Sequence, residues 1–260
     1  MTQLTAVVIA RDEERYIGEC LDSLKWADER LVVLDSRSQD RTAEIARGRG
    51  ASVVVETFEN FSQMRNQALA EARSEWVLFV DADERVSPEL AAEVQATFED
   101  SQRRDLVGYW IPRRNYMWGK WIRHGGWFPD YQLRLLKRAC AHYDVRRAVH
   151  EVAQLTGPAG YLRNTIEHIN FETMEAFHRT QRAYARYEAR TLYLSGCRAR
   201  LHNFVLQPLR EFRRRYLQLS GWRDGRYGLM LCFYLAYYTF IAYIDLWRLD
   251  HTTQPAQKQV

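Results

Sequence analysis

In the first hundred residues, short apolar runs alternate with segments whose apolar residues recur every three or four positions. Such runs are typical of buried strands, and the periodic segments are typical of amphipathic helices. We predict strands at 4–10, 31–34, 52–55 and 76–80, and helices at 17–24, 41–47, 61–72 and 88–98. This alternation indicates an α/β, Rossmann-like fold, with a mostly parallel central sheet, flanking helices and right-handed crossovers.

The pattern changes after residue 105. Two predicted strands, 107–112 and 131–137, flank an aromatic and basic segment, and a further strand is predicted at 161–169. From residue 172 onward the pattern is helical, with predicted helices at 172–194, 198–219 (which contains Pro208) and 226–249. We therefore predict an α/β domain over residues 1–170 and a C-terminal helical region over residues 171–260.

The last predicted helix differs from the others in composition. Residues 229–244 contain no charged side chain and are rich in tyrosine and phenylalanine. A membrane-spanning helix needs about 20 apolar residues, and tyrosine favours the headgroup region of a bilayer. The preceding stretch, 198–226, carries eight arginines against two acidic residues. These features predict a helix that lies on an anionic membrane surface, with a buried hairpin or an oligomer interface as the alternatives.

The formal net charge of +4 conceals two regions of opposite sign. Residues 1–100 hold 21 acidic and 11 basic residues, a net charge of −10, whereas the remainder holds 12 and 26, a net charge of +14. The positive part should favour anionic partners. It shows no recognisable RNA- or DNA-binding module, so we expect no nucleic-acid partner.

The four cysteines are scattered without metal-ligand or CxxC spacing. This arrangement is typical of buried thiols in a reducing compartment. They are Cys20, Cys140, Cys197 and Cys232. The N-terminal sequence does not resemble a signal peptide, and we expect the α/β domain to lie in the cytoplasm.

The strongest candidate for chemistry follows the predicted strand 76–80. Asp81, Ala82 and Asp83 come directly after this strand, and Ser87 and Pro88 then carry the N-cap and first-position signals of a helix. The carboxyl ends of parallel strands are where α/β sheets bind ligands. Carboxylate oxygens at such a place suit Mg²⁺ or Mn²⁺, which complete their coordination shells with water and a substrate diphosphate.

Two further acidic clusters follow the first two predicted strands. The first begins with Ala10, Arg11 and Glu13, and the second begins with Asp35. Three such strand ends side by side would form one sheet edge that can receive a nucleotide. A carboxylate at this edge can accept the N3–H of a uracil, and Arg65 could contact the diphosphate.

Taken in order, these motifs resemble those of family 2 glycosyltransferases of the GT-A fold. The resemblance covers about residues 4–170, and within the family it is greatest to the bacterial lipopolysaccharide-core glucosyltransferases of the KdtX/WaaE type. The matching segments are VVIARDEERYIGECLDSL, VVLDSRSQDRTAEIA, MRNQALAEARSEWVLFVDADERV, DYQLRLLKR and VHE. Two positions depart from the family pattern, because Asp12 replaces the usual Asn and Arg37 replaces the usual Gly.

The resemblance implies an inverting, metal-dependent transfer of a sugar from a nucleotide-diphosphate donor, a UDP-hexose, to a lipid-linked acceptor such as the lipopolysaccharide inner core. The enzyme would be attached peripherally to the inner face of the bacterial inner membrane, with a possible homo-oligomer through the C-terminal helices. Asp35 would bind the base, Asp81 would lie on the ribose and metal side, and Asp83 would bind the metal directly. His168 resembles a histidine that completes the metal shell in some GT-A enzymes.

An inverting transfer also needs a general base for the acceptor hydroxyl. The order of motifs implies Glu151 as the first choice and Asp130 as the second. Six residues are candidates for acceptor binding through stacking or phosphate contacts: Lys120, Trp121, Arg123, His124, Trp127 and His150. Two other functions remain as alternatives, transfer to a different polysaccharide or lipid-linked carrier, and a nucleotidyltransferase, although the first strand lacks a Gly-rich nucleotide loop.

Overall fold

The computed structural model describes residues 3–100, 105–145 and 152–252. The chain forms two compact units, one of residues Met1–Arg114 and Asp130–Ile169, the other of residues Asn115–Pro129 and Asn170–Val260. The segment 115–129, which the sequence places within an α/β domain of residues 1–170, therefore groups with the C-terminal helices.

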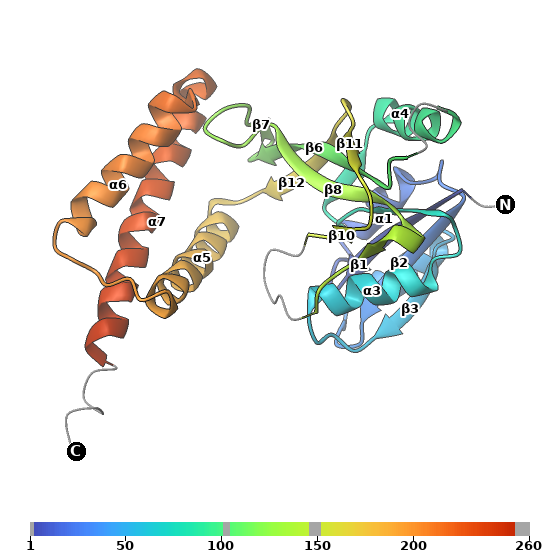
Figure 1. Ribbon diagram of the computed structural model, residues 1–260, viewed down its shortest axis with the longest axis horizontal. Coiled ribbons are helices and arrows are strands. Elements are labelled where there is room, and N and C mark those ends of the chain that lie inside the picture. The colour runs from blue at the N-terminus through green and yellow to red at the C-terminus, as the bar shows by residue number, and fades with distance from the viewer. Residues whose placement is uncertain (1–2, 101–104, 146–151, 253–260) are drawn as a thin grey trace, which may run out of the picture. The chain divides into compact units, whose positions relative to one another are not determined.

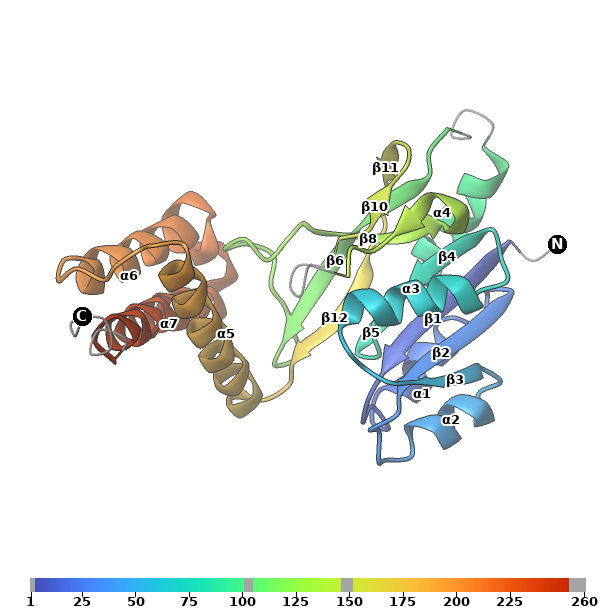
Figure 2. The same ribbon diagram turned by 60° about the horizontal axis from the view of Figure 1, so that its bottom comes forward.

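The first unit is built on a mixed sheet with the strand order β3-β2-β1-β4-β8-β6-β12-β5 (Figures 1 and 2). The strands of this path are β1 (Leu4–Ala10), β2 (Glu29–Asp35), β3 (Ser52–Glu56), β4 (Trp76–Phe79), β5 (Glu84–Val86), β6 (Gly108–Met117), β8 (Asp130–Lys137) and β12 (Ile166–Phe171). The short strand β11 (Ala159–Tyr161) pairs with β6, and β9 (Ala141–His142) pairs with β10 (Gln154–Leu155). Within the second unit, β7 (Lys120–Trp121) pairs with Tyr116 and Met117 at the end of β6.

The first four strands are parallel, as predicted, and β1 lies between β2 and β4. Val7 is paired with Leu31 on one side and with Phe79 on the other. The helices that connect these strands are α1 (Ile17–Asp22), α2 (Thr42–Gly48), α3 (Phe61–Glu71) and, after β5, α4 (Pro88–Glu99). Parallel strands end at the same edge of a sheet, so the chain after β1, β2 and β4 emerges at one place.

Alternate residues of β1 belong to two different hydrophobic clusters. Val8 packs in a cluster with residues of α1, α2 and α4, whereas Val7 packs in a cluster with residues of α3. The sheet is thus covered on both faces, which explains why its central strands are apolar without polar alternation.

The remaining strands are mostly antiparallel. β8 pairs with β4 and with β6, and β12 pairs with β5. The predicted strand 161–169 was wrong in extent, because residues 162–165 separate β11, which is parallel to β6, from β12.

The second unit contains three long helices, α5 (Met174–Leu194), α6 (Asn203–Arg213) and α7 (Gly225–Thr252) (Figure 1). α6 begins five residues later than predicted, contains Pro208, and continues into a π-helical turn, Arg214–Gln218. A 3₁₀ turn, Gly221–Asp224, precedes α7. The buried core of this unit includes Met117 and Ile122 from the 115–129 segment, together with Phe177 and Leu231.

One helical stretch in the described part of the chain, Gly221–His251, is long and apolar enough to cross a membrane. Only 28% of its most apolar window is buried within the protein. This finding rests on length and composition alone, which a core helix can also satisfy.

Candidate active site

The Asp81–Asp83 turn is fixed at both of its ends. The backbone N–H of Asp81 donates to Glu84 Oε2 at 2.9 Å, and the N–H of Glu84 donates to the carbonyl of Asp81 at 2.9 Å. Beyond it, Ser87 Oγ accepts from the N–H of Leu90, and Pro88 occupies the first turn of α4, as predicted. The turn therefore holds two carboxylates at the end of β4 between ordered elements.

The carboxylate of Asp81 is held by an arginine from β8. Arg134 Nη1 donates to Asp81 Oδ1 at 3.0 Å, and Nη2 donates to Oδ2. Withdrawal from water would raise the pKa of Asp81, but the positive charge and hydrogen bonds of Arg134 hold this pKa well below its usual range. Asp81 is therefore an anion at any physiological pH.

Arg134 belongs to a buried charge network that sequence reasoning did not identify. Glu84 is fully buried and accepts from Arg134 Nη2 at 3.3 Å and from Arg113 Nη1 at 3.2 Å. Arg113 also donates to Asp130, with Nη2 at 2.7 Å from Oδ2. The predicted base Asp130 is thus ion-paired with Arg113, and its other oxygen accepts from Gln132 Nε2 at 2.8 Å.

The second carboxylate of the turn, Asp83, has a different environment. His168 Nε2 lies 3.2 Å from Asp83 Oδ2, and the N–H of Ile169 donates to the Asp83 carbonyl at 2.9 Å. His168 reaches this position because β12 pairs antiparallel with β5, in a register that places His168 opposite Glu84. Two of the predicted metal ligands are therefore adjacent. Asp81, the third, is engaged by Arg134.

The loops after β1 and β2 are joined by hydrogen bonds, as expected for neighbouring strand ends. Asp12 Oδ1 accepts from the N–H of Gln39 at 2.8 Å, and the N–H of Glu13 donates to Thr42 Oγ1 at 2.8 Å. Ala10 is buried at the end of β1, and Arg11 Nε lies 3.4 Å from Asp12 Oδ2. The acidic clusters thus meet at one sheet edge.

The pKa of Glu13 is affected by the carboxylates at this edge. Burial, and then the negative charges of Asp83, Asp40, Asp81 and Asp12, raise the pKa of Glu13 from 4.5 to about 7. Several carboxylates of this edge therefore lie close enough to Glu13 to oppose its ionisation, and such a cluster of negative charge attracts a cation.

Asp35, the predicted base-binding residue, is buried at the end of β2. Arg37 donates to both of its oxygens, with Nη2 at 2.6 Å from Oδ2 and Nε at 3.0 Å from Oδ1. The Arg37 hydrogen bonds lower the pKa of Asp35. The Arg37 guanidinium also lies 5.1 Å from the centre of the Phe58 ring.

Arg65, the candidate diphosphate ligand, lies beside the same turn. Its guanidinium is 5.3 Å from the Phe79 ring centre and 5.6 Å from that of Tyr143, and Nη2 is 3.8 Å from Asp81 Oδ1. Ala82 is buried between the two aspartates. Arg65 and Arg134 thus place two cations next to Asp81.

The predicted acceptor residues that the structure describes lie in the second unit and contact its other residues. His124 Nδ1 is 3.1 Å from Asp224 Oδ1, and the backbone N–H groups of Arg123 and His124 both donate to Asp224 Oδ2. The Arg123 guanidinium also lies over the Trp121 ring, the Lys120 ammonium lies over the Tyr227 ring, and the Trp127 carbonyl accepts from Asn115 Nδ2.

Two predicted residues, His150 and Glu151, lie outside the described residues. Among residues 3–100, 105–145 and 152–252, no group of three or more His, Cys, Asp and Glu side chains is close enough to form a metal site by itself. The four cysteines are all free thiols.

The sequence did contain a signal for the missed network. Arg134 lies in the segment DYQLRLLKR between Leu133 and the buried pair Leu135 and Leu136, so its charge interrupts an apolar run. A charged residue in such a strand needs a partner. The identity of that partner depends on the antiparallel pairing of β8 with β4, which local sequence does not reveal.

Residues 5–168 match the family model described as glycosyl transferase family 2. The match covers more than half of the chain, and the chain therefore belongs to this family and is a glycosyltransferase. Its mixed α/β sheet is of the predicted GT-A type. The family match argues against the nucleotidyltransferase alternative.

Among curated proteins, the chain is similar to the lipopolysaccharide core biosynthesis glycosyltransferase LpsC of Rhizobium meliloti, with 28% identity over 92% of this chain and 89% of that protein. Among solved structures, it is similar to S. aureus TarS 1–349 in complex with UDP, with 17% identity, a TM-score of 0.48, and coverage of 95% of this chain and 89% of that one. It is also similar to glucosyl-3-phosphoglycerate synthase from Mycobacterium tuberculosis in complex with Mn²⁺, UDP and glucosyl-3-phosphoglycerate, with 20% identity, a TM-score of 0.36 and 44% coverage of each chain.

Proposed function

We propose that this glycosyltransferase moves a hexose, with inversion, from a UDP-sugar to a lipid-linked acceptor of the lipopolysaccharide inner core. The observation that carries the proposal is the meeting of three acidic strand ends, those of β1, β2 and β4, at one edge of the sheet. The similarity to LpsC over nearly the whole of both chains supports the acceptor class.

The donor would lie along this edge. Asp35 would accept the N3–H of uracil, and Ala10, Arg11 and Glu13 would line the nucleotide pocket. Arg65, 3.8 Å from Asp81, is placed to contact the diphosphate.

A divalent cation fits the residues present. Asp83 offers a carboxylate oxygen, and His168 offers an imidazole nitrogen 3.2 Å away, a donor set that Mn²⁺ accepts. Burial, and then the negative charges of Asp83 and other nearby carboxylates, raise the pKa of Glu13, so carboxylates cluster around the same turn. When bound, such an ion supplies positive charge that stabilises the leaving diphosphate. Asp81, held by Arg134, would orient the turn and face the ribose.

The general base is assigned to Glu151, with Asp130 as the alternative. The two ion-pair contacts from Arg113 and the hydrogen bond from Gln132 favour a structural role for Asp130, since a base must be able to receive a proton. We therefore expect Glu151→Gln to lower kcat by about 10² or more, and Asp130→Asn to act mainly through stability.

The test is turnover of nucleotide sugars by the full chain, with Mn²⁺ or Mg²⁺, in the presence and absence of purified lipid-linked core acceptor. We expect acceptor-dependent release of UDP that is lost with EDTA and in Asp83→Ala. Turnover only with a different lipid-linked or polysaccharide acceptor would favour the alternative substrate class. Metal-independent turnover by Asp83→Ala would contradict the proposed metal site.

A further inference from the structure

Exposed apolar residues lie on α6 and just before it. Leu201, Val205, Leu206 and Leu209 are 88%, 66%, 55% and 59% exposed. Within α6, Leu209 follows Val205 and Leu206 at spacings of four and three residues, which places these three on one side of the helix, and Leu201 lies just before it. Scattered apolar residues are common on surfaces, but a continuous aliphatic row marks an interaction surface.

The half-buried face of α6 and of the turn after it carries polar as well as aromatic side chains. Gln207, Glu211 and Arg215 are half-buried, and Glu211 Oε1 accepts from Arg215 Nε. Phe204 contacts Phe240 of α7, with ring centres 6.2 Å apart. α6 thus packs on α7 through a mixed face while its aliphatic residues point outward. An aliphatic row on the exposed side is not expected for a helix on the surface of a soluble domain.

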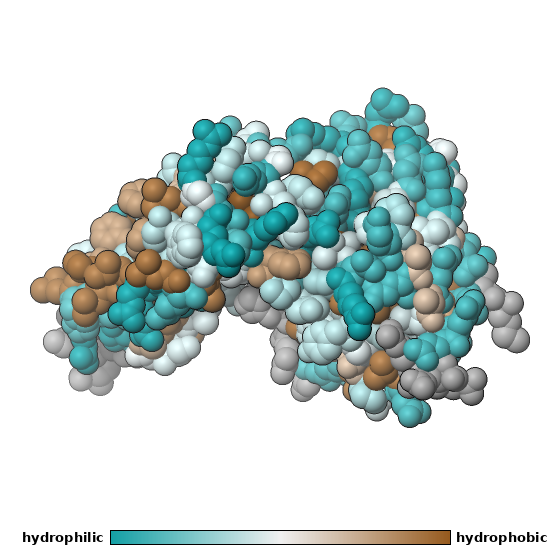
Figure 3. Space-filling model, turned by 90° about the horizontal axis from the view of Figure 1, so that it is seen from above, coloured by the Kyte–Doolittle hydropathy of each residue, from teal (hydrophilic) through white to brown (hydrophobic). Residues whose placement is uncertain are grey.

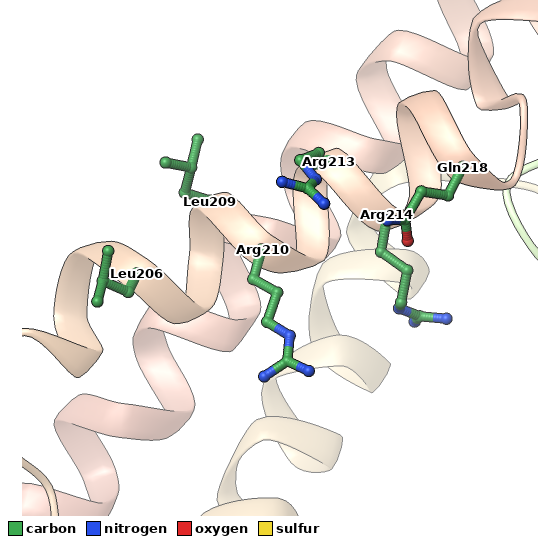
Figure 4. A pocket seen from close by; sticks show the side chains of 6 residues that line it. All are labelled: Leu206, Leu209, Arg210, Arg213, Arg214 and Gln218. Atoms are coloured by element: carbon green, nitrogen blue, oxygen red, sulfur yellow. The ribbon is translucent and has the colours of Figure 1, made fainter.

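Arginines follow the exposed aliphatic residues along α6 and the turn after it. Arg210, Arg213 and Arg214 follow Leu209 on the next turns and line the same pocket as Leu206 and Leu209. In Figure 4 the two leucines extend from one side of the helix, and Arg210 and Arg214 extend toward the other. Arg214 is paired with Glu211 at 2.8 Å, whereas Arg210 and Arg213 form no ion pair with any residue that the structure describes. Between 201 and 219 every exposed charged residue is an arginine. Figure 3 shows apolar side chains next to hydrophilic ones on the surface of the helical unit.

We propose that this α6 face is the surface through which the enzyme docks on an anionic membrane. The aliphatic side chains would enter the boundary between headgroups and acyl chains, and Arg210 and Arg213 would contact lipid phosphates. α6 has 11 residues, too few to span a bilayer, so the helix lies in the interface.

A second copy of the chain is a poorer occupant of this face. In a two-fold dimer the same patch meets itself, and the arginine end would face arginines or leucines with no carboxylate to pair with. An anionic lipid surface supplies both an apolar layer and the missing negative charges. The charge of the face therefore favours lipid over self-association.

This inference deepens the proposed action on a lipid-linked acceptor, and its test measures binding instead of turnover, so that the two proposals can fail separately. The full chain is floated with vesicles of phosphatidylcholine alone and of phosphatidylcholine with phosphatidylglycerol, at low and high salt. We expect flotation with the anionic vesicles at low salt, and at least tenfold weaker partitioning to neutral vesicles or at high salt.

Two double variants separate the contributions. Leu206→Ser with Leu209→Ser should weaken partitioning about tenfold or more, and Arg210→Gln with Arg213→Gln should remove most of the preference for anionic lipid. Val55→Ser, which changes an exposed aliphatic residue of the first unit, is the matched control and should float like the wild type. Circular dichroism and thermal unfolding check that each variant folds.

Unchanged flotation of the leucine double variant would overturn the proposal, as would a wild type that does not float with anionic vesicles. A wild-type dimer in sedimentation analysis that dissociates on Leu206→Ser with Leu209→Ser would assign the face to a second copy and also overturn it. Loss of flotation in both double variants, with turnover of a detergent-solubilised acceptor retained, would support it.

Discussion

Arg134 on β8 and Asp81 at the end of β4 form a two-point ion pair, and the same guanidinium also contacts Glu84 at 3.3 Å. The two aspartates of the Asp81–Asp83 turn therefore have different surroundings, since Asp83 lies beside His168 and not beside an arginine. We infer that Asp81 supports the turn and that Asp83 serves the metal.

This difference predicts unequal effects of the two substitutions on the free energy of unfolding. Asp81→Asn removes the negative charge that is paired with the almost fully buried Arg134, and should lower the free energy of unfolding by about 2 kcal/mol. The expected loss is smaller than for a fully buried ion pair because Asp81 is 39% exposed. Asp83→Asn should change it by less than about 1 kcal/mol. Urea unfolding monitored by circular dichroism measures both. Equal losses in the two variants would contradict the division of roles.

Glu84 should be the most sensitive carboxylate of the site to removal. Glu84→Ala leaves Arg113 and Arg134 without the fully buried anion that lies between them, and should cost about 3 kcal/mol of unfolding free energy. Glu44→Ala breaks an exposed pair with Arg41 and serves as the control, with a much smaller expected effect because solvent screens the pair. A similar cost for the two variants in urea unfolding would show that the network contributes little.

Glu13 predicts a pH dependence of stability. Because burial and neighbouring carboxylates raise the pKa of Glu13 to about 7, the folded protein binds this proton more tightly than the unfolded chain does. Stability should therefore fall as pH rises from about 4.5 to 7, by on the order of 1 kcal/mol after allowance for solvent screening. Glu13→Gln should flatten this slope in thermal unfolding at several pH values, whereas Glu71→Gln should leave it unchanged. A steeper slope in Glu13→Gln would refute the assignment.

Arg37 should compete with a uracil for Asp35. Both Asp35 oxygens accept from Arg37, so a base that hydrogen-bonds to Asp35 must displace these contacts. Because the arginine is half exposed, its removal in Arg37→Gly should tighten UDP binding by up to about fivefold. Isothermal titration calorimetry measures this, with Arg41→Gly as an exposed-arginine control. Weaker UDP binding by Arg37→Gly would mean that Arg37 contacts the nucleotide itself.

Local sequence patterns predicted the parallel half of the fold well. The strand before Asp81, the cap at Ser87 and the helix that begins at Pro88 all depend on neighbouring residues, and all three are confirmed. The adjacency of Asp83 and His168 agrees with a sequence expectation that came from the family resemblance.

Contacts that depend on distant strands could not be predicted in the same way. The Arg134–Asp81 pair joins residues 53 positions apart, and the His124–Asp224 pair joins residues 100 positions apart. The aromatic and basic segment 115–129 suggested an acceptor loop, but its composition suits packing against the C-terminal helices equally well. Only the contacts with elements remote in the sequence distinguish an acceptor loop from a segment that packs on these helices.

The central claim is that the edge formed by β1, β2 and β4 binds a nucleotide diphosphate with a metal held by Asp83. The most direct test is calorimetric titration of UDP into the wild type and into Asp83→Ala, each with and without Mn²⁺. The account predicts that Mn²⁺ tightens UDP binding by the wild type at least about tenfold and has no effect on Asp83→Ala. Equal Mn²⁺ dependence in the two proteins would contradict it.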